Sequence, residues 1–492
     1  MSQIAPHFAG PGRHPDLDAE QVRALVDRSR AAQPAWAALG FDGRRRVLLR
    51  ARSIMARDMD RFIGAVVRDT RKPYEDAQLE VLSGVASLDF WAKRAEHYLK
   101  DQRVRTRSPF VFRYKLEIGF APRGVIGVIG PWNVPMINSF GDCIPALAAG
   151  NGVVLKPSEL TPSLGLECEA LMREAGAPDG LYAVATGAGA TGEALIDAVD
   201  FLQFTGSTAT GKRVAERAIQ TLTPYTLELG GNDPMIVCAD ADLDRAASAA
   251  VFYGFGNAGQ ICVSVERVYV EESVHDQFVA KVVERTGRLR QGLGHGEPGR
   301  VEVGPMISPA QADVVKAHID DAVAQGATVR TGGGLVETSD RFIEPTVLTG
   351  VTQSMRCMRE ETFGPTLPIM PVRDIEEAIT LANDTPYGLG AVVFTRDRAR
   401  GEAIAKRLQA GTVNVNDAWM SYFALEVPMG GHKQSGIGAR HGAEGIQKYC
   451  DKQTRVVARF HLGNEPVWYP HDGRVGRLLR RVIPLVYGRA PR

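Results

Sequence analysis

Hydrophobic positions recur at helical spacing at the start of the chain. After a Pro/Gly-rich beginning, Asp16 or Asp18 is a candidate helix N-cap. The positions that follow on one helical face are Val22, Leu25, Val26 and Ser29. The pattern continues to about Lys100, so we expect helices over this part of the chain.

From Gly124 onward, short apolar and β-branched runs alternate with stretches that are long enough for crossover helices. The runs that predict buried strands span residues 124–129, 153–156, 181–186, 201–205 and 234–238. Strands that alternate with helices in this way predict a parallel, doubly wound sheet, which binds ligands at the carboxyl ends of its strands.

A second series of the same kind follows. Its expected strands span residues 267–272, 328–333, 391–394 and 412–416, and its expected helices span 275–290 and 309–325. The sequence therefore predicts an α/β fold with two doubly wound lobes of comparable size and a ligand-binding cleft between them.

The composition is that of a globular protein without a nucleic-acid partner. Apolar residues make up 44% and charged residues 23%, and the 58 basic side chains nearly cancel the 57 acidic ones. A nucleic-acid-binding surface needs a basic excess, which this balance does not provide. The six cysteines are scattered singly, without Cys-x-x-Cys or any zinc spacing, so no metal site is expected.

Scattered cysteines are typical of a reducing compartment. The first residues lack a basic region followed by an apolar run, and no apolar run reaches about 18 residues. We therefore expect a cytoplasmic protein without a secretory signal or a membrane-spanning segment.

Two glycine-rich turns are candidates for nucleotide binding. Gly187, Gly189 and Gly192 form GxGxxG after an expected strand. The nearest acids, Asp197 and Asp200, come too early for the acid that accompanies this fingerprint, so an ordinary glycine-rich turn is the alternative.

The second turn, Gly206-Ser207-Thr208-Ala209-Thr210-Gly211, opens a helix directly after the strand at 201–205. Backbone N–H groups at a helix start suit a phosphate. Ser and Thr at this place are also ordinary N-caps, so this motif alone leaves both interpretations open.

Three residues form a candidate catalytic set. Cys262 follows small residues in GNAGQIC, so it is either an exposed nucleophile or a buried structural thiol. Glu228 is a lone acid in an apolar strand, where burial raises the pKa of a carboxyl toward the range of a general base. Asn133 lies between two prolines in GPWNVP, a rigid place for an oxyanion donor.

These motifs, in their order and spacing, resemble the aldehyde dehydrogenase superfamily over about residues 15–462. The resemblance implies that Cys262 is the nucleophile, Glu228 the general base and Asn133 the oxyanion donor. The residues that it assigns to NAD(P) binding are Trp132, Lys156, Ser158, Glu159, Gly206, Ser207, Gly211, Gly230, Glu361 and Phe363. It also implies that the cofactor binds the turn at 206–211 and not the GxGxxG turn.

Within the family, PMGG (428–431), SGIG (435–438) and RHGAEG (440–445) are similar to a bacterial branch that includes succinate-semialdehyde dehydrogenases. Two departures stand out. Met429 replaces the Phe of the common PFGG, and SGIGARHG has Ala439 inserted before Arg440, with no Glu following. We expect both departures to lie outside the chemical centre and to affect substrate shape and loop packing.

The resemblance also implies a division of the chain. Residues 1–105 and 121–229 would form a Rossmann-like NAD(P)-binding domain, and 230–447 the catalytic domain. The exposed strands within 106–120 and 448–462 would form a small β oligomerisation element, because exposed strand edges need a partner. A homodimer or a homotetramer is therefore expected, and 463–492 would be a basic amphipathic C-terminal tail.

The implied reaction begins when the Cys262 thiolate attacks an aldehyde and ends when a thioester is hydrolysed. An ordinary thiol with a pKa of about 8.5 is mostly protonated at neutral pH, so we expect the surroundings of Cys262 to favour the anion. One alternative is acyl transfer to coenzyme A, which the presence of Glu228 disfavours. Others are a non-catalytic binding protein with the same fold and a nucleotide-independent cysteine hydrolase, which would want a histidine partner.

The cofactor and the substrate are less sharply defined. Glu159 near the adenosine ribose would repel a 2′-phosphate and favours NAD, whereas Lys156 leaves NADP as the alternative. The substrate is a small-molecule aldehyde. An aromatic cluster formed by Trp419, Tyr422 and Phe423 indicates either an apolar or aromatic aldehyde or ordinary loop packing, with Val134, Met136 and Asn138 on the other wall. Succinate semialdehyde rests on analogy, since no arginine clamp is identifiable.

The tail combines an apolar helical face with arginines. The apolar positions are Val475, Leu478, Leu479, Val482 and Ile483, and the basic ones are Arg474, Arg477, Arg480 and Arg481. The acids of this segment are Glu465 and Asp472, and Pro484 limits the helix. Such a segment can lie on an anionic membrane, but we favour an arm that packs on a partner subunit or over the substrate mouth.

Overall fold

The computed structural model describes residues 14–108, 111–294, 296–336, 341–460, 465, 468–471 and 473–488. The chain divides into two compact units. The larger comprises Met1–Tyr98 and Pro122–Asp451, and the smaller comprises Leu99–Ala121 and Lys452–Arg492. Two large sheets belong to the larger unit, and the third sheet has three strands.

Helices form the start of the larger unit, as the periodicity predicts. They are α1 (Ala19–Ala38), α2 (Gly40–Arg57), α3 (Met59–Thr70) and α4 (Tyr74–Leu99). Asp18 is the N-cap of α1: its carboxylate accepts from the backbone N of Gln21 at 2.9 Å, and the Gln21 side chain accepts from the backbone N of Asp18 at 3.0 Å. This capping box satisfies two N–H groups that the helix leaves unpaired.

A six-stranded sheet carries the first β-α-β series, in the order β15-β7-β6-β3-β4-β5. Its strands are β3 (Val125–Ile129), β4 (Gly152–Lys156), β5 (Tyr182–Val184), β6 (Phe201–Thr205), β7 (Tyr225–Glu228) and β15 (Gly436–Ile437). All neighbours are parallel except β15 and β7. The connecting helices are α5 (Gly141–Ala149), α6 (Pro162–Glu174), α7 (Gly189–Ile196) and α8 (Thr208–Gln220), with a π-helical turn at Met136–Phe140.

A seven-stranded sheet follows, in the order β10-β11-β12-β9-β8-β13-β14. Its strands are β8 (Asp233–Val237), β9 (Val265–Glu271), β10 (Thr328–Thr331), β11 (Thr346–Thr349), β12 (Thr366–Val372), β13 (Gly390–Phe394) and β14 (Thr412–Val415). The accompanying helices are α9 (Leu243–Phe255), α10 (Glu272–Thr286), α11 (Pro309–Ala324), α12 (Arg356–Arg359), α13 (Ile375–Asn383), α14 (Arg398–Ala405), α15 (Met420–Phe423) and α16 (Gly442–Gln447). The prediction of two doubly wound α/β lobes is confirmed, although β11 and β12 were not predicted.

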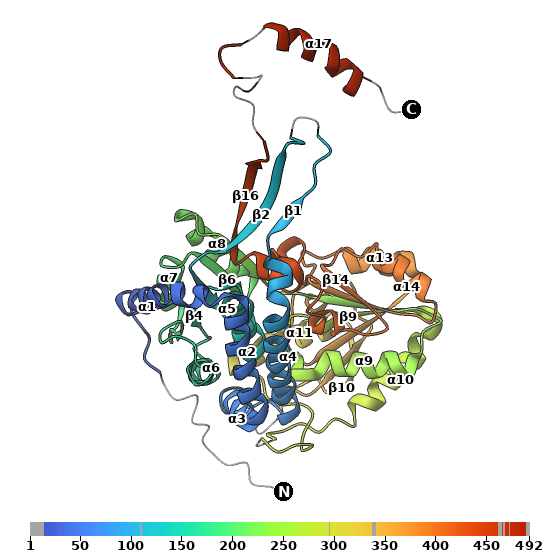
Figure 1. Ribbon diagram of the computed structural model, residues 1–492. Helices are drawn as coiled ribbons and strands as arrows, with labels where there is room; N and C mark the ends of the chain where they lie inside the picture. The colour runs from blue at the N-terminus through green and yellow to red at the C-terminus, as the bar shows by residue number, and fades with distance from the viewer. Residues whose placement is uncertain are drawn as a thin grey trace. The chain divides into compact units, whose positions relative to one another are not determined.

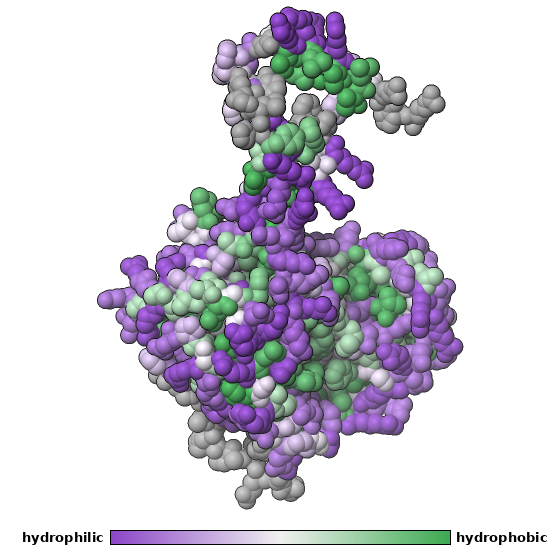
Figure 2. All heavy atoms as spheres, in the orientation of Figure 1, coloured by the Kyte–Doolittle hydropathy of each residue, from purple (hydrophilic) through white to green (hydrophobic). Residues whose placement is uncertain are grey.

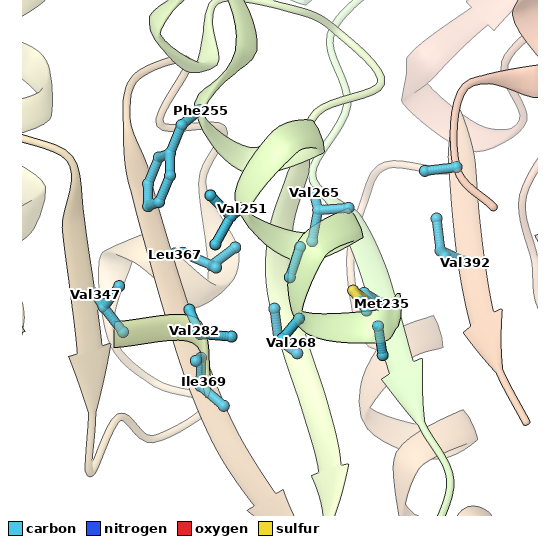
Figure 3. Packing of buried hydrophobic residues seen from close by; sticks show 14 of the residues in the cluster. Met235, Val251, Phe255, Val265, Val268, Val282, Val347, Leu367, Ile369 and Val392 are labelled. Atoms are coloured by element: carbon cyan, nitrogen blue, oxygen red, sulfur yellow. The ribbon is translucent and has the colours of Figure 1, made fainter. Parts of the chain in front are cut away.

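The seven-stranded sheet is covered on both faces (Figure 1). Figure 3 shows Met235, Val268 and Leu367 from three neighbouring strands packed beneath helical side chains such as Val251. The next residue on β8, Ile236, belongs to a separate cluster with residues of α13 and α14. Because both faces are covered, the central strands β8, β9 and β13 are buried along nearly their whole length and do not alternate between buried and exposed positions.

The smaller unit contains a three-stranded sheet in the order β1-β2-β16 and one further helix. The elements are β1 (Gln102–Val104), β2 (Tyr114–Pro122), β16 (Cys450–Ala458) and α17 (Gly473–Tyr487). Seven of the nine β16 residues are exposed, as predicted, whereas β2 is mostly half-buried. No helix among the described residues is long and apolar enough to span a bilayer.

Candidate active site

The carboxyl ends of four neighbouring parallel strands bring the predicted motifs to one edge of the six-stranded sheet. Ile129 at the end of β3 pairs with Lys156 at the end of β4, and Thr205 at the end of β6 pairs with Glu228 at the end of β7. Strands in this register end together, so the turns that follow them lie in one row, where doubly wound sheets bind ligands.

Asn133 lies in the turn after β3 and is held by hydrogen bonds on two sides. Its Nδ2 donates to the carbonyl of Gln260 at 2.9 Å. The backbone carbonyl of Asn133 accepts from Lys72 Nζ at 2.6 Å and from Asn257 Nδ2 at 3.1 Å. Lys72 is ion-paired with Glu80, and both side chains are buried. An amide NH₂ carries two donors, so Asn133 keeps a second proton for an oxyanion.

The turn before Cys262 has an unusual backbone. Asn257, Ala258 and Gly259 have φ values of 53°, 55° and 72°, all left-handed. A Cβ at position 259 would lie 2.1 Å from the carbonyl oxygen of Gly364, so only glycine fits there. A left-handed alanine is strained, and strain of this kind is typical of functional turns.

Cys262 is half-buried, whereas the other five cysteines are buried. Burial raises the pKa of its thiol to about 12; the Arg440 guanidinium opposes this rise, and the carboxylates of Glu361, Asp233 and Glu228 add to it. The expectation that the surroundings favour the thiolate is therefore wrong for the protein alone, because one nearby cation does not offset apolar burial and three carboxylates.

Glu228 ends β7 with its side chain buried, at 3% exposure. Its Oε1 has no hydrogen-bond partner among the described residues. Burial raises the pKa of the carboxyl to about 7, against the opposing charges of Arg440 and Lys448. The expected rise toward the range of a general base is thus present, and a base works best when its pKa is near the operating pH.

Glu361 approaches the turn after β7 closely, so a side chain at position 230 would displace its carboxylate. Its Oε1 accepts from the backbone N of Gly231 at 2.8 Å, and a Cβ on Gly230 would lie 2.4 Å from its Oε2. Burial raises the pKa of Glu361 to about 7. Nearby in the sequence, Phe363 has a φ of 51° and packs edge-on against Trp132, with ring centroids 5.5 Å apart.

Lys156 is buried, and its ammonium lies 3.5 Å from a carboxylate oxygen of Glu159. Burial lowers the pKa of Lys156, while Glu159 opposes that shift. The Glu159 side chain is 54% exposed, so its charge reaches solvent at the end of β4. Ser158 is buried between them, and its hydroxyl accepts from the backbone N of Leu160 at 3.2 Å.

The second glycine-rich turn opens α8 at the same edge. Gly206 donates from its backbone N to the carbonyl of Glu228 at 3.1 Å, and Ser207 caps the helix by accepting from the backbone N of Thr210 at 3.3 Å. A Cβ on Gly211 would lie 2.4 Å from a methyl of Leu229. A helix N-terminus suits a diphosphate, so these residues fit a dinucleotide.

The GxGxxG turn is covered by the chain's own N-terminal segment. Thr186 donates from its hydroxyl to the carbonyl of Pro15 at 2.7 Å, and Thr191 donates to the carbonyl of Leu17 at 2.8 Å. A Cβ on Gly187 would lie 2.1 Å from the Thr191 hydroxyl. The glycine therefore allows a tight turn against residues 15–17, which is the ordinary alternative to a cofactor site.

An apolar pocket of about 510 Å³, part of it open to solvent, has Cys262 in its lining. Trp419, Tyr422 and Phe423 contribute one side, as expected, and Val134 and Asn138 contribute the other. The further lining residues are Lys72, Asp76, Leu79, Glu80, Ile137, Asn257, Ile261 and Val263. Met136 was expected here but lines a neighbouring cavity instead.

Arg440 is buried and joins four side chains from distant parts of the chain. One terminal nitrogen donates to Asn138 Oδ1 and, at 3.2 Å, to the Tyr422 hydroxyl; the other donates to Asp142 at 3.1 Å and to Thr205 at 2.8 Å. The Tyr422 hydroxyl itself donates to Asn138 Oδ1. We expected the departure from the family motif at Ala439 and Arg440 to lie outside the chemical centre. This expectation is wrong, since Arg440 forms hydrogen bonds with two pocket residues and its charge acts on the Cys262 thiol.

A model of the "Aldehyde dehydrogenase family" matches residues 10–455. The chain belongs to the aldehyde dehydrogenase family. It is therefore an oxidoreductase that acts on aldehydes, and the resemblance of its motifs to this family is confirmed.

Relatives within the aldehyde dehydrogenases share most of this chain. A "Putative succinate-semialdehyde dehydrogenase [NADP(+)]" of Mycolicibacterium smegmatis is 44% identical over 444 residues, which are 90% of this chain and 85% of the relative. The "4,4'-diapolycopene aldehyde oxidase" of a Methylomonas species is 38% identical over 97% of this chain and 89% of its own. Among solved structures, the "Putative Aldehyde Dehydrogenase PutA" of Anabaena variabilis superposes with a TM-score of 0.86 at 36% identity, covering 92% of this chain and 96% of that one.

Several residues of this aldehyde dehydrogenase site were not found from the sequence. Glu80 lies on the inward face of α4 with Ala77 and Val81, and an acid on an apolar helical face is a signal of a buried partner, here Lys72. Arg440 carried a signal too, because it departs from the family motif. Asn257 and Gln260 flank the nucleophile in a polar and glycine-rich run and gave no separate signal.

Proposed function

We propose that this aldehyde dehydrogenase oxidises its substrate to the carboxylic acid through a covalent bond to Cys262, with NAD(P) as cofactor. The observation that carries the proposal is that Cys262, which is less buried than the other five cysteines, lines the apolar pocket, while the buried Glu228 carboxyl acts on its thiol electrostatically. The proposal assigns Cys262 as nucleophile, Glu228 as base and Asn133 as oxyanion donor.

In the first half of the reaction, the Cys262 thiol gives its proton to a water molecule, and its sulfur forms a bond to the aldehyde carbon. The carbonyl π electrons move to oxygen, and the resulting oxyanion accepts hydrogen bonds from Asn133 Nδ2 and from the backbone N of Cys262. One such donor is worth about 3–4 kcal/mol in other enzymes. NAD(P), when bound, supplies the acceptor for the hydride that the carbon loses, which leaves a thioester on Cys262.

In the second half, Glu228 takes a proton from a water molecule that attacks the thioester carbon. The C–S bond then breaks, the sulfur leaves as thiolate and the carboxylic acid is released. The presence of a buried carboxyl with a pKa of about 7 supports hydrolysis over acyl transfer to coenzyme A.

We propose that the cofactor lies along the carboxyl edge of the six-stranded sheet. Lys156, Ser158 and the α8 N-terminus with Ser207 would hold its diphosphate and adenosine ribose. Glu361, across the turn at Gly230, would accept from ribose hydroxyls, and Phe363 with Trp132 would flank the ring that reacts. The exposed Glu159 carboxylate favours NAD over NADP, and the family relatives named for NADP keep the other cofactor as an alternative.

The pocket chemistry favours an aldehyde with an apolar or aromatic body. Its charged lining residues are Lys72, Asp76 and Glu80, and the Lys72 ammonium is already paired with Glu80. Among the described lining residues, no cation is left for a second carboxylate. Succinate semialdehyde is the second candidate, because relatives at 41–44% identity are named for it.

The division of labour between parts of the chain follows the sequence predictions. Residues 1–105 and 121–229 would bind the cofactor, and 230–447 would hold the nucleophile and the substrate. The strands within 106–120 and 448–462 would pair copies of the chain into a homodimer or homotetramer, because the edge formed by β16 is exposed. A cytoplasmic location is likewise a prediction.

The test compares Cys262→Ala with Cys357→Ala, a buried cysteine on α12 that serves as the matched control. We expect Cys262→Ala to abolish aldehyde-dependent formation of NADH or NADPH and Cys357→Ala to retain it. Aliphatic, aromatic and carboxylated aldehydes are compared by kcat/KM with both nucleotides. Turnover by Cys262→Ala would refute the assignment of Cys262 as nucleophile. A preference for succinate semialdehyde would refute the proposal that the substrate has an apolar or aromatic body.

A further inference from the structure

The helix α17 separates its side chains by kind. Its aliphatic residues recur at spacings of three and four on one side: Val475, Leu478, Leu479, Val482, Ile483 and Val486. The opposite side carries Arg474, Arg477, Arg480 and Arg481. Figure 2 shows the aliphatic side chains of α17 as one continuous hydrophobic surface, with hydrophilic atoms on the other side.

None of the α17 residues is buried. Leu478 is 61% exposed, Ile483 47% and Val486 51%. Apolar surface of this kind is stabilised by about 25 cal/mol for each Å² that is removed from water, so a continuous aliphatic stripe needs a covering surface.

The charges around the stripe indicate what that covering surface is. Residues 473–488 contain four arginines and no acid. A second copy of α17 would bring four more arginines beside the first four. An anionic bilayer, in contrast, offers hydrocarbon to the stripe and negative headgroups to the arginines that flank it.

Two exposed aromatic residues precede the helix in the chain. Trp468 is 61% exposed and Tyr469 is 83% exposed. Tryptophan and tyrosine are enriched where membrane meets water, because their rings are apolar and carry one polar group. The segment just before them is anchored, since Glu465 is buried and ion-paired with Arg113 of the same unit.

We propose that α17, together with Trp468 and Tyr469, binds the surface of membranes that contain anionic phospholipids. A helix of 15 residues is about 22 Å long, too short to cross a bilayer, so it lies in the plane of the interface. The guanidinium groups of the arginines contact lipid phosphates, while the aliphatic side chains enter the region between the lipid headgroups and the acyl chains. This surface is independent of the aldehyde chemistry proposed above.

The experiment uses the full chain and vesicle co-sedimentation. Vesicles of phosphatidylcholine containing phosphatidylglycerol are compared with vesicles of phosphatidylcholine alone, at low and high salt. We expect the protein to sediment with the anionic vesicles, to bind the neutral ones at least about tenfold less, and to be released by salt.

The decisive variant is Leu478→Ser with Ile483→Ser, which removes two aliphatic side chains from the stripe without changing the charge. Burying one such side chain is worth at least about a tenfold change in an equilibrium, so vesicle binding is expected to fall by at least that factor. Ile219→Ser with Leu222→Ser is the matched control, because these residues are 60% and 79% exposed but lie outside the tail. Unchanged turnover of a water-soluble aldehyde shows that each variant is folded.

Three results would overturn the proposal. The first is a protein that stays in the supernatant with both kinds of vesicle. The second is equal loss of binding in the tail variant and in its matched control. The third is a truncation after residue 465 that keeps vesicle binding but lowers the molar mass in solution, since that result assigns the stripe to a second copy of the chain.

Discussion

The cofactor edge of the six-stranded sheet and the pocket around Cys262 are built by different means. At the edge, backbone register aligns Ile129 with Lys156 and Thr205 with Glu228. In the pocket, side chains bond across long stretches of sequence, as Arg440 does with Asn138 over 302 positions. The edge follows from local β-α-β order, whereas the pocket exists only once both lobes are in place.

This difference predicts how each region responds to substitution. Turns at the edge offer several backbone N–H groups and side chains to one extended ligand, so the loss of one contact leaves the others. Around Cys262, by contrast, the buried guanidinium of Arg440 and the buried carboxyl of Glu228, which ends β7, each act on the thiol, and Glu228 is the base that we propose. We therefore expect single substitutions to change rates by orders of magnitude in the pocket and by smaller factors at the edge.

The largest effect is expected for Glu228→Gln, because it removes the base and keeps the shape. Deacylation should slow by ~10²–10⁴, while the first turnover still releases a burst of reduced cofactor equal to the number of sites. Rapid-mixing absorbance measures both phases. For the unsubstituted protein, kcat should rise with pH and level off above the Glu228 pKa of about 7, because the carboxylate is the active form.

The control for this variant is Glu193→Gln, an exposed glutamate on α7 that is paired with Arg217. It should keep both the burst and the steady-state rate. Unaltered steady-state turnover by Glu228→Gln would show that Glu228 has no role in the mechanism. The expected contrast between pocket and edge would then depend on Arg440 alone.

Arg440→Met is expected to have the next largest effect, on both stability and rate. It leaves Asp142 buried without its partner, which costs about 3–5 kcal/mol of unfolding free energy, measured by urea titration. The guanidinium also lowers the pKa of Glu228, so its removal should move the acid limb of the kcat profile to higher pH. A shift of one unit reduces the rate below pH 7 by up to about tenfold.

Arg440→Lys separates charge from geometry. Lysine keeps the positive charge but cannot reach Asn138, Tyr422, Asp142 and Thr205 together, because it lacks the planar fork of arginine. We expect the acid limb to stay near its original pH while the KM for aldehyde rises. An acid limb that does not move in either variant would show that Arg440 has a structural role alone.

The edge was largely predictable from the sequence, whereas the pocket was predictable only in part. Its expected lining residues Trp419, Tyr422, Phe423, Val134 and Asn138 are present, but their buried polar partners were not predicted. Short, largely apolar runs such as 125–129 and 201–205 lie between helices of ordinary length, so the sequence pattern identifies them and the topology then fixes where their ends meet. The strand β11 was missed because its only apolar residues are Val347 and Leu348, and β12 was missed because two prolines interrupt its apolar run. The site residues that the sequence identified were those in contiguous motifs.

Long-range partners account for what was missed. The ion pair of Lys72 with Glu80 holds the carbonyl of Asn133, but its role depends on a turn 61 positions away. The protonation of Cys262 was predicted with the wrong sign, since burial and the charges of Glu361 and Asp233 depend on the folded surroundings and not on the GNAGQIC motif. Charge balance in a buried site is a tertiary property.

A pair of glycine substitutions tests the edge itself. In Gly230→Ala the new methyl would meet the Glu361 carboxylate, so that side chain must shift. Overpacking typically costs about 1–3 kcal/mol, and we expect the KM for the cofactor to rise by about tenfold. Gly189→Ala belongs to the GxGxxG turn, where a Cβ meets nothing within 4 Å, and should leave that KM unchanged. A rise in KM for Gly189→Ala instead would return the GxGxxG turn to the cofactor site.

The smallest effect is expected for substitution of Glu159, because about half of its side chain is exposed to solvent. Glu159→Gln removes the carboxylate that would repel a 2′-phosphate but leaves its neighbour Lys156, which we propose to contact the adenosine ribose. Exposed charge interactions are worth about 0.2–1 kcal/mol, so the KM for NADP should fall relative to that for NAD by no more than about fivefold. The KM ratio at low and high salt measures it, and the change should shrink with salt because solvent ions screen the interaction. An unchanged KM ratio would mean that Lys156 and the α8 turn set the cofactor preference without Glu159. In that case the loss of one contact at the edge would have no measurable effect on cofactor choice.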